Sequence, residues 1–138
     1  MSELSEHIQK ADWKKEKHVP VIECPDQIKA NDIFQVKVCL GKEVAHPNTT
    51  EHHIRWINLY YHDEGGKFAH EVAHVEFNAH GESTEGADKG PVYTHHEVVT
   101  SLKVAKSGML HAMSYCNIHG LWQSSKKITS PRTSCAGL

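Results

Sequence analysis

The feature that most constrains the fold is a series of short runs of β-branched and aromatic residues, separated at regular intervals by turn-forming residues. In residues 33–40, Phe34, Val36 and Val38 share one face and polar residues take the other, which is the period of a half-buried strand. Seven or eight such runs in about 100 residues predict an all-β fold, an immunoglobulin-like antiparallel β-sandwich. The predicted strands are 19–23, 33–40, 54–61, 68–77, 92–105 (one long strand or two short ones), 109–116 and 122–129.

Helical character is confined to the N-terminus. Leu4, Ile8 and Ala11 recur at helical spacing, which predicts a short helix, or otherwise a loop, over residues 3–11. A length of 138 residues predicts a single sandwich domain over 1–129. Residues 130–138 are rich in Ser, Pro and Gly, and we expect them to form a disordered tail that contains Cys135.

The charge pattern narrows the range of partners. The net charge is −2 and no long basic run is present, which argues against nucleic acid. No apolar run approaches the ~20 residues of a membrane span, and residues 1–6 lack the apolar core of a secretory signal. We therefore expect a cytoplasmic protein with reduced cysteines, in which Cys24 and Cys39 are small buried or edge thiols.

Three segments offer metal ligands at the expected strand ends. Cys116 and His119 are three residues apart where a strand gives way to a turn. His46 and His52 flank Pro-Asn-Thr-Thr, a turn that can bring two imidazoles together. A third segment, residues 16–18, has the sequence Glu-Lys-His. One sulfur with three or more ring nitrogens favours redox iron or copper over structural zinc, which prefers two or more cysteines.

The other histidines and the tryptophans have simpler interpretations. His53 follows His52 and would point to the opposite side of a strand, and His80 is a candidate turn or supporting residue. Trp13, Trp56 and Trp122 are expected in the core or an interface. The histidines that alternate with apolar residues are predicted to lie on the surface: His62, His70, His74, His95, His96 and His111.

Five segments carry a resemblance to a known family. The most specific are His-Pro-Asn-Thr-Thr-Glu-His-His at 46–53 and Ser-Tyr-Cys-Asn-Ile-His-Gly-Leu-Trp at 114–122. With residues 16–23, 41–43 and 77–83, they resemble the superoxide reductases, also called neelaredoxins, over about residues 10–128. The chain shows no cysteine-rich N-terminal domain of the desulfoferrodoxin type, so it resembles the one-iron class.

The resemblance implies a fold, a cofactor and a reaction. The implied reaction is one-electron reduction of superoxide to hydrogen peroxide without release of oxygen, with a rubredoxin-like protein as electron donor and a homotetramer as the assembly. The implied site is a mononuclear non-haem iron with an axial Cys116. Lys17 would face the open position of the ferrous form, and Glu16 would fill that position in the ferric form. The four implied equatorial ligands are His18, His46, His52 and His119.

The chemistry of these residue types agrees with the resemblance. A thiolate opposite an open position pushes electron density toward iron and favours donation of one electron, and a nearby lysine attracts an anionic substrate. His95-His96 departs from the family, which has an acidic residue and a proline there.

Two alternatives to this reaction remain open. A blue-copper carrier is disfavoured because no methionine occurs in residues 120–123, after the last candidate histidine. A zinc-bearing binding module is disfavoured by the single cysteine.

Overall fold

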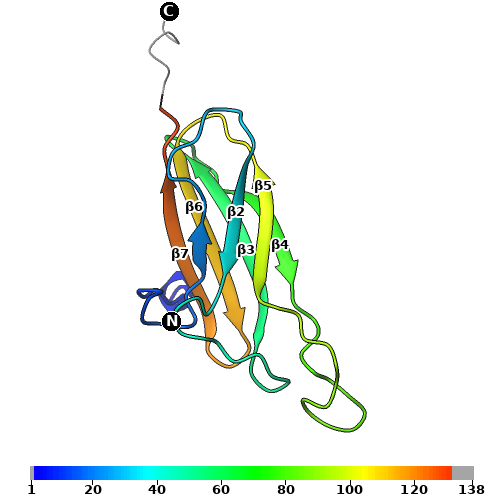
Figure 1. Ribbon diagram of the computed structural model, residues 1–138. Helices are drawn as coiled ribbons and strands as arrows, with labels where there is room; N and C mark the ends of the chain where they lie inside the picture. The colour runs from blue at the N-terminus through cyan, green and yellow to red at the C-terminus, as the bar shows by residue number, and fades with distance from the viewer. Residues whose placement is uncertain (1, 132–138) are drawn as a thin grey trace, which may run out of the picture.

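The chain folds into two antiparallel sheets packed face to face, which confirms the predicted sandwich (Figure 1). The computed structural model describes residues 2–131, and most of the predicted tail, with Cys135, lies outside them. One sheet has the order β1-β2-β5 and the other the order β4-β3-β6-β7. The elements are η1 (Leu4–His7), β1 (Val21–Glu23), β2 (Phe34–Cys39), β3 (Ile54–Asp63), β4 (His70–Glu76), β5 (Glu97–Leu102), β6 (Gly108–Cys116) and β7 (Gly120–Ile128).

The core lies between the two sheets and follows the two-residue period of the sequence. In β2, Phe34, Val36 and Val38 are buried, as predicted. In β6 every second residue from Gly108 to Cys116 is buried and the residues between them are half-buried. Burial of these apolar side chains is the main favourable contribution to folding, and it fixes the register that places Cys116 at the end of its strand.

The N-terminal prediction was wrong in extent. Only Leu4–His7 is helical, as a single 3-10 turn. Gln9 instead pairs with β7: its N–H donates to the Leu121 carbonyl (2.9 Å) and its carbonyl accepts from the Gln123 N–H (2.9 Å). The edge of β7 offers these unpaired backbone groups, and pairing with them competes with continuation of the helix.

Two other boundaries differ from expectation. Of residues 92–105 only Glu97–Leu102 is a strand, while Tyr93 makes an isolated bridge with His80. At the C-terminus, the Ser130 N–H donates to Ser107 Oγ (2.8 Å), so the expected tail is attached at its first residue.

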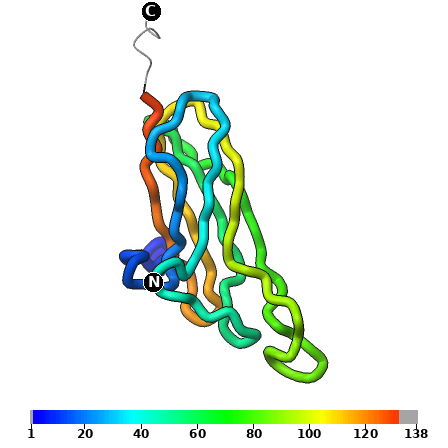
Figure 2. The backbone as a smooth tube through the Cα atoms, in the orientation of Figure 1, coloured from blue at the N-terminus to red at the C-terminus, as the bar shows by residue number. Residues whose placement is uncertain are grey.

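One end of the sandwich holds the end of β6 and the starts of β3 and β7, because these strands pair antiparallel in the observed registers. The start of β1, in the other sheet, lies at the same end (Figure 1). The loop over residues 46–53 lies at this end, and the long connection from β4 to β5 extends beyond the sheets beside it (Figure 2). Thr50 Oγ1 donates to the His80 carbonyl (2.6 Å) and Asn48 Nδ2 to the Thr94 carbonyl (3.1 Å), which ties the two loops together.

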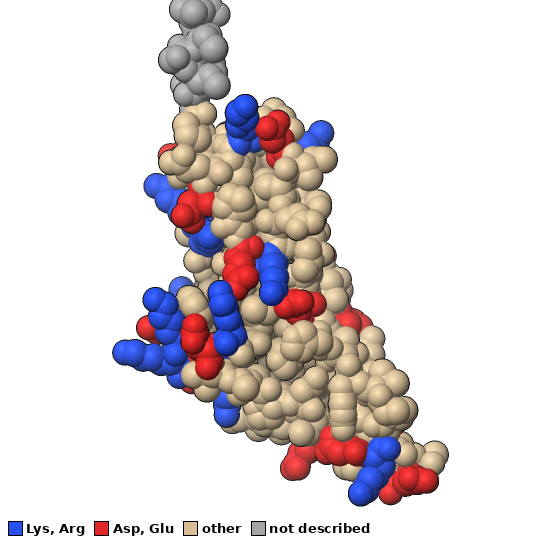
Figure 3. All heavy atoms as spheres, viewed as in Figure 1, with Lys and Arg blue, Asp and Glu red and all other residues tan. Residues whose placement is uncertain are grey.

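The surface carries both signs of charge. Figure 3 shows Lys and Arg interspersed with Asp and Glu on the visible face, and the two signs nearly balance to a net charge of −2. Within the described residues no helix has the length and apolar character required to cross a bilayer.

Candidate metal centre

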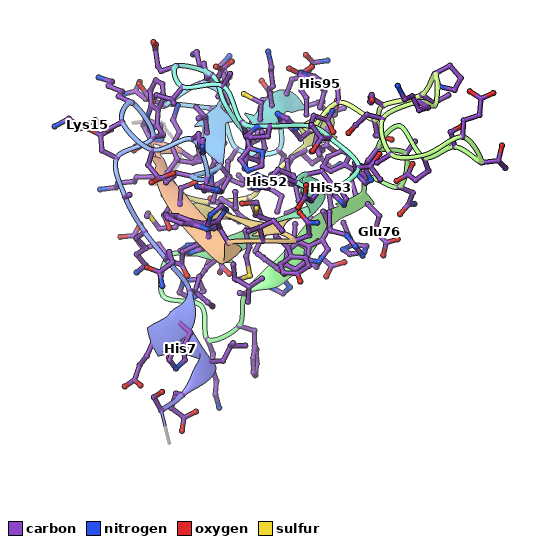
Figure 4. All side chains as sticks on the ribbon, turned by 90° about the horizontal axis from the view of Figure 1, so that it is seen from below. His7, Lys15, His52, His53, Glu76 and His95 are labelled. Carbon is purple, nitrogen blue, oxygen red and sulfur yellow. The ribbon has the colours of Figure 1, made fainter. Side chains whose placement is uncertain are left out.

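Four potential ligands from separate segments converge at this end of the sandwich. One ligand atom from each of His18, His52, Cys116 and His119 lies within 4.8 Å of all the others. His119 Nδ1 is 3.0 Å from His18 Nε2 and 3.2 Å from His52 Nε2, and His52 Nε2 is 3.2 Å from Cys116 Sγ. Figure 4 looks onto this end, with His52 near the middle and Lys15 and His7 at the periphery.

The His18 ring is oriented by its outer nitrogen. Nδ1–H donates to Glu16 Oε1 at 2.6 Å, so the lone pair of Nε2 faces the cluster. A carboxylate on the far nitrogen of a histidine is the usual support of a metal-binding imidazole, because it fixes the tautomer and raises the basicity of the ligating nitrogen.

His46 brings a fourth imidazole to the same place. Its Nδ1–H donates to the Pro47 carbonyl (2.6 Å). Its ring centroid lies 4.8 Å from that of His18 and 4.9 Å from that of His52. Its Nε2 is buried with no hydrogen-bond partner among the described residues. A buried, unsatisfied lone pair costs free energy that a bound cation removes, so His46 fits as a further ligand.

Burial keeps these imidazoles neutral. It lowers the pKa of His46 to about 3. Burial also lowers the pKa of His18, against the opposing effect of Glu16, and together with His119 it lowers the pKa of His52. Neutral imidazole is the form that binds a metal. Nitrogen lone pairs only 3.0 to 3.2 Å apart repel one another unless a proton or a cation lies between them.

The turn from β6 to β7 positions two of the ligands. Cys116 is fully buried at the end of β6, whereas His119 is exposed in the turn. The His119 N–H donates to Cys116 Sγ at 3.4 Å, a contact that would support negative charge on a metal-bound sulfur. Gly120 follows with a φ of +81°, a backbone conformation that favours glycine.

Asn117 joins this turn to the histidine loop, a role that the sequence reasoning missed. Its Oδ1 accepts from the His53 N–H (2.9 Å) and its Nδ2 donates to the Glu51 carbonyl (2.8 Å). Asn117 therefore fixes His52 relative to Cys116. Its position between two ligands was the only available signal in the sequence.

Glu16 and Lys17 lie beside the cluster in different ways. The Glu16 carboxylate contacts Nδ1 of His18 and is not one of the four converging ligands. Although burial opposes it, the contact with His18 lowers the pKa of Glu16 and keeps it ionised. Lys17 is half-buried, and its charge contributes to lowering the pKa of both His18 and His52.

One prediction about the other histidines was wrong. His96 is only 6% exposed, because the connection from β4 to β5 folds its ring edge-on against His46, with centroids 5.8 Å apart. His62 and His111 are half-buried, and His70, His74 and His95 are exposed as expected.

His53 and His80 lie outside the cluster, as expected. They stack with their ring centroids 3.4 Å apart, and both are buried. This stack packs the histidine loop onto the neighbouring connection, so His80 is a supporting residue.

The fold and the site define a class: a β-sandwich protein with a transition-metal site of one cysteine and several histidines at one end. The Desulfoferrodoxin family model matches residues 10–125, and the chain belongs to that family. A neelaredoxin of Megalodesulfovibrio gigas is 58% identical over 125 residues, which cover 91% of this chain and 96% of the relative. A superoxide reductase of Pyrococcus furiosus is 53% identical over 121 residues, 88% of this chain and 95% of the relative.

The similarity extends to the three-dimensional structure. The superoxide reductase (neelaredoxin) of Archaeoglobus fulgidus, solved in its reduced form, superposes with a TM-score of 0.82 at 52% identity. The superposition covers 89% of this chain and 98% of that one.

Proposed function

We propose that this chain is a superoxide reductase that converts superoxide to hydrogen peroxide at a single iron. The observation that carries the proposal is the convergence of one cysteine sulfur and four imidazoles at one end of the sandwich, in a chain of this family. The ligands would be Cys116, His18, His46, His52 and His119. Iron held there would supply one electron to superoxide, and a thiolate ligand would make the ferrous form a ready donor and the ferric form a weak oxidant.

The protein residues supply access and attraction. His119 is exposed, so the site is open to solvent from one side. The two pockets of the surface that lie against residues 27–32 and 101–107 are at the other end of the sandwich, so neither of them is part of the site. An anion of two atoms needs no enclosed pocket. The charge of Lys17, felt at both His18 and His52, attracts it to the exposed side.

Glu16 takes two positions in this proposal. In the structure it accepts the hydrogen bond of His18 Nδ1, which would support that ligand without taking a place on the metal. The resemblance to the one-iron class supports a second position, in which Glu16 is the sixth ligand of the ferric form. The negative charge of the carboxylate would stabilise the ferric charge there.

Partners and compartment belong to the same proposal. The electron returns from a separate donor protein of rubredoxin-like type, and the chain assembles as a homotetramer; both expectations rest on resemblance to one-iron relatives. The free thiols of Cys24, Cys39 and Cys116 support a reducing compartment, which we take to be the cytoplasm.

Metal analysis combined with a visible spectrum tests the proposal. Protein purified from cells should contain one iron per chain and turn blue after oxidation with ferricyanide, through thiolate-to-iron charge transfer. Cys116→Ser should abolish the blue band, whereas Cys39→Ser, which replaces a buried cysteine outside the cluster, should retain it. Zinc or copper in place of iron would contradict the proposal.

A further inference from the structure

Trp122 contacts two of the proposed ligands in two different ways. Its indole stacks on the His18 ring with centroids 5.0 Å apart and planes 16° apart. Its Nε1–H donates to the His119 carbonyl at 3.2 Å. Because His18 precedes β1 and His119 lies in the β6–β7 turn, a single side chain links ligand segments that are about a hundred residues apart in sequence.

The position of the indole is itself fixed by its strand. Trp122 lies opposite Ser114 in the pairing of β7 with β6, and Ser114 Oγ donates to the His18 carbonyl (3.3 Å). On its other edge Trp122 bridges Gln9, at the start of the segment that leads to residues 16–18. The indole is therefore held by a strand of the sheet, and it contacts the segment that contains Glu16, Lys17 and His18.

The contacts of His18 with Glu16 and Ser114 do not by themselves fix its ring. His46 and His119 also contact the ring. Glu16 fixes one nitrogen and Ser114 fixes the backbone, but rotation of the ring about the line of the Glu16 hydrogen bond is restricted by neither. The flat indole of Trp122, which stacks on the ring, restricts that rotation. It also shields one face of the ring from water, which strengthens electrostatic interactions on that side.

We propose that Trp122 is a positioning residue that sets the orientation of His18 relative to His119, and thereby the retention and the electronic environment of the metal. The inference rests on the proposed iron centre. It goes beyond that centre by assigning part of its stability to a side chain that offers no ligand atom.

Two substitutions separate the contacts of the indole. Trp122→Leu removes both the stacking face and the N–H donor, whereas Trp122→Phe keeps an aromatic face and removes only the donor. Trp56→Leu is the matched control, because Trp56 is also half-buried but lies on the outer face of β3 beside Tyr115. The dissociation constant for ferrous iron is measured by competition with a chelator, and the charge-transfer band is recorded after oxidation.

Loss of a side chain that supports a metal ligand raises the dissociation constant by ~10–100-fold, and we expect at least ~10-fold for Trp122→Leu. The band should shift in the same variant. Trp122→Phe should show smaller changes of the same sign, and Trp56→Leu should match the unsubstituted chain in both measurements.

Equal dissociation constants for Trp122→Leu and Trp56→Leu would overturn the inference. Should Trp122→Leu fail to fold, Trp122→Met, which also removes the flat face, takes its place: wild-type affinity together with an unshifted band in that variant rejects the positioning role. Failure of the unsubstituted chain to bind iron would instead count against the proposed function, so the two failures are distinguishable.

Discussion

At the scale of single residues, the hydrogen bond at one ring nitrogen decides which imidazoles can bind a metal. His18 and His46 each donate from Nδ1 to an oxygen, which leaves the Nε2 lone pair free. His53 donates from Nδ1 to the Thr49 carbonyl and accepts at Nε2 from Arg55 (3.1 Å), so neither nitrogen remains available. His46 and His53, which lie in the same loop, thus acquire different roles from their hydrogen bonds rather than from their spacing.

Substitution of Lys17 should slow the capture of superoxide. Lys17→Ala removes the positive charge closest in sequence to His18, and we expect the bimolecular rate to fall by about 10-fold and to depend less on ionic strength. Pulse radiolysis of the ferrous protein at several salt concentrations measures both effects. Lys103→Ala is the control, because it makes the same change in net charge at an exposed position at the other end of the sandwich. Equal rates for the two variants would assign Lys17 to ordinary surface solvation.

Substitution of Glu16 should affect the oxidised form of the site. Glu16→Ala removes the carboxylate that lies on His18 in the structure and that we propose as the ferric sixth ligand. Capture of superoxide by the ferrous form should remain within about 3-fold of wild type, because we propose that Glu16 is not a ligand of that form and loss of one carboxylate changes local attraction only modestly. The ferric band should shift, and azide should bind more tightly than in Glu43→Ala, which removes an exposed carboxylate. An unshifted ferric band would remove Glu16 from the ligand set.

His96 should make stability depend on pH. Burial lowers its pKa from 6.5 to about 4. Between these values the unfolded chain binds a proton that the folded chain does not, so stability that is present above pH 6.5 is lost as the pH falls toward 4. For the metal-free protein we expect His96→Gln to lose about 2 kcal/mol less than wild type between pH 7 and pH 5. Urea unfolding at both pH values measures this, and an equal loss in the variant and in the wild type would contradict it.

At the scale of elements, the site depends on where strands stop. Cys116 is the last residue of β6 and Gly120 the first of β7, so the two proposed ligands of this hairpin are held by two strands that pair along their whole length. A register shift interrupts the pairing of β3 with β6 between Ile54 and Trp56, directly after the histidine loop. Such irregularities redirect the chain at the end of a sheet, here toward the cluster.

Two glycines allow the role of the hairpin to be tested. Gly120 and Gly65 have φ values of +81° and +78°, and an added Cβ would meet nothing within 4 Å at either position. Alanine should therefore cost about 1 kcal/mol of stability at each position, from backbone strain alone. Only Gly120→Ala should also speed the loss of iron to a chelator, because only that turn carries ligands. Similar rates of iron loss in the two variants would separate the turn conformation from the metal site.

The sequence predicted those elements whose secondary structure follows from their own pattern of side chains. It was less successful where contacts with residues far along the chain determine the structure. Alternation placed Phe34, Val36 and Val38 in the core because each residue of a strand meets the core independently of its neighbours. The helix expected over residues 3–11 was too long, since Gln9 finds backbone partners on β7 that no local pattern reveals. His96 was misplaced for the same reason: its burial depends on the fold of a long connection against His46.

At the scale of the whole molecule, the sandwich is a rigid frame that opens the site at one end and leaves the chemistry to a few side chains. The candidate ligands could be proposed from motifs, but their geometry required the fold. Spacing in the sequence places Cys116 near His119, whereas His18, which precedes β1 of the other sheet, reaches them only through the packing of the two sheets. The tryptophan on His18 could not be recognised from sequence, because an indole in a strand has the same pattern as one in a core.

The reaction type is a property of the whole protein and has a simple stoichiometric test. The iron-loaded ferrous protein should consume superoxide, yield about one hydrogen peroxide for each superoxide and release no oxygen, because a thiolate ligand makes ferric iron a weak oxidant. A dismutase would yield about half as much peroxide and would evolve oxygen. Turnover should then stop until an electron donor is supplied, since the one iron that we propose for each chain can give only one electron. Oxygen-electrode and peroxide assays on one sample measure both products, with Cys116→Ser as the control that retains the histidines and lacks the thiolate. Sustained evolution of oxygen without added reductant would show that the site completes the cycle alone, and the reductase assignment would then be wrong.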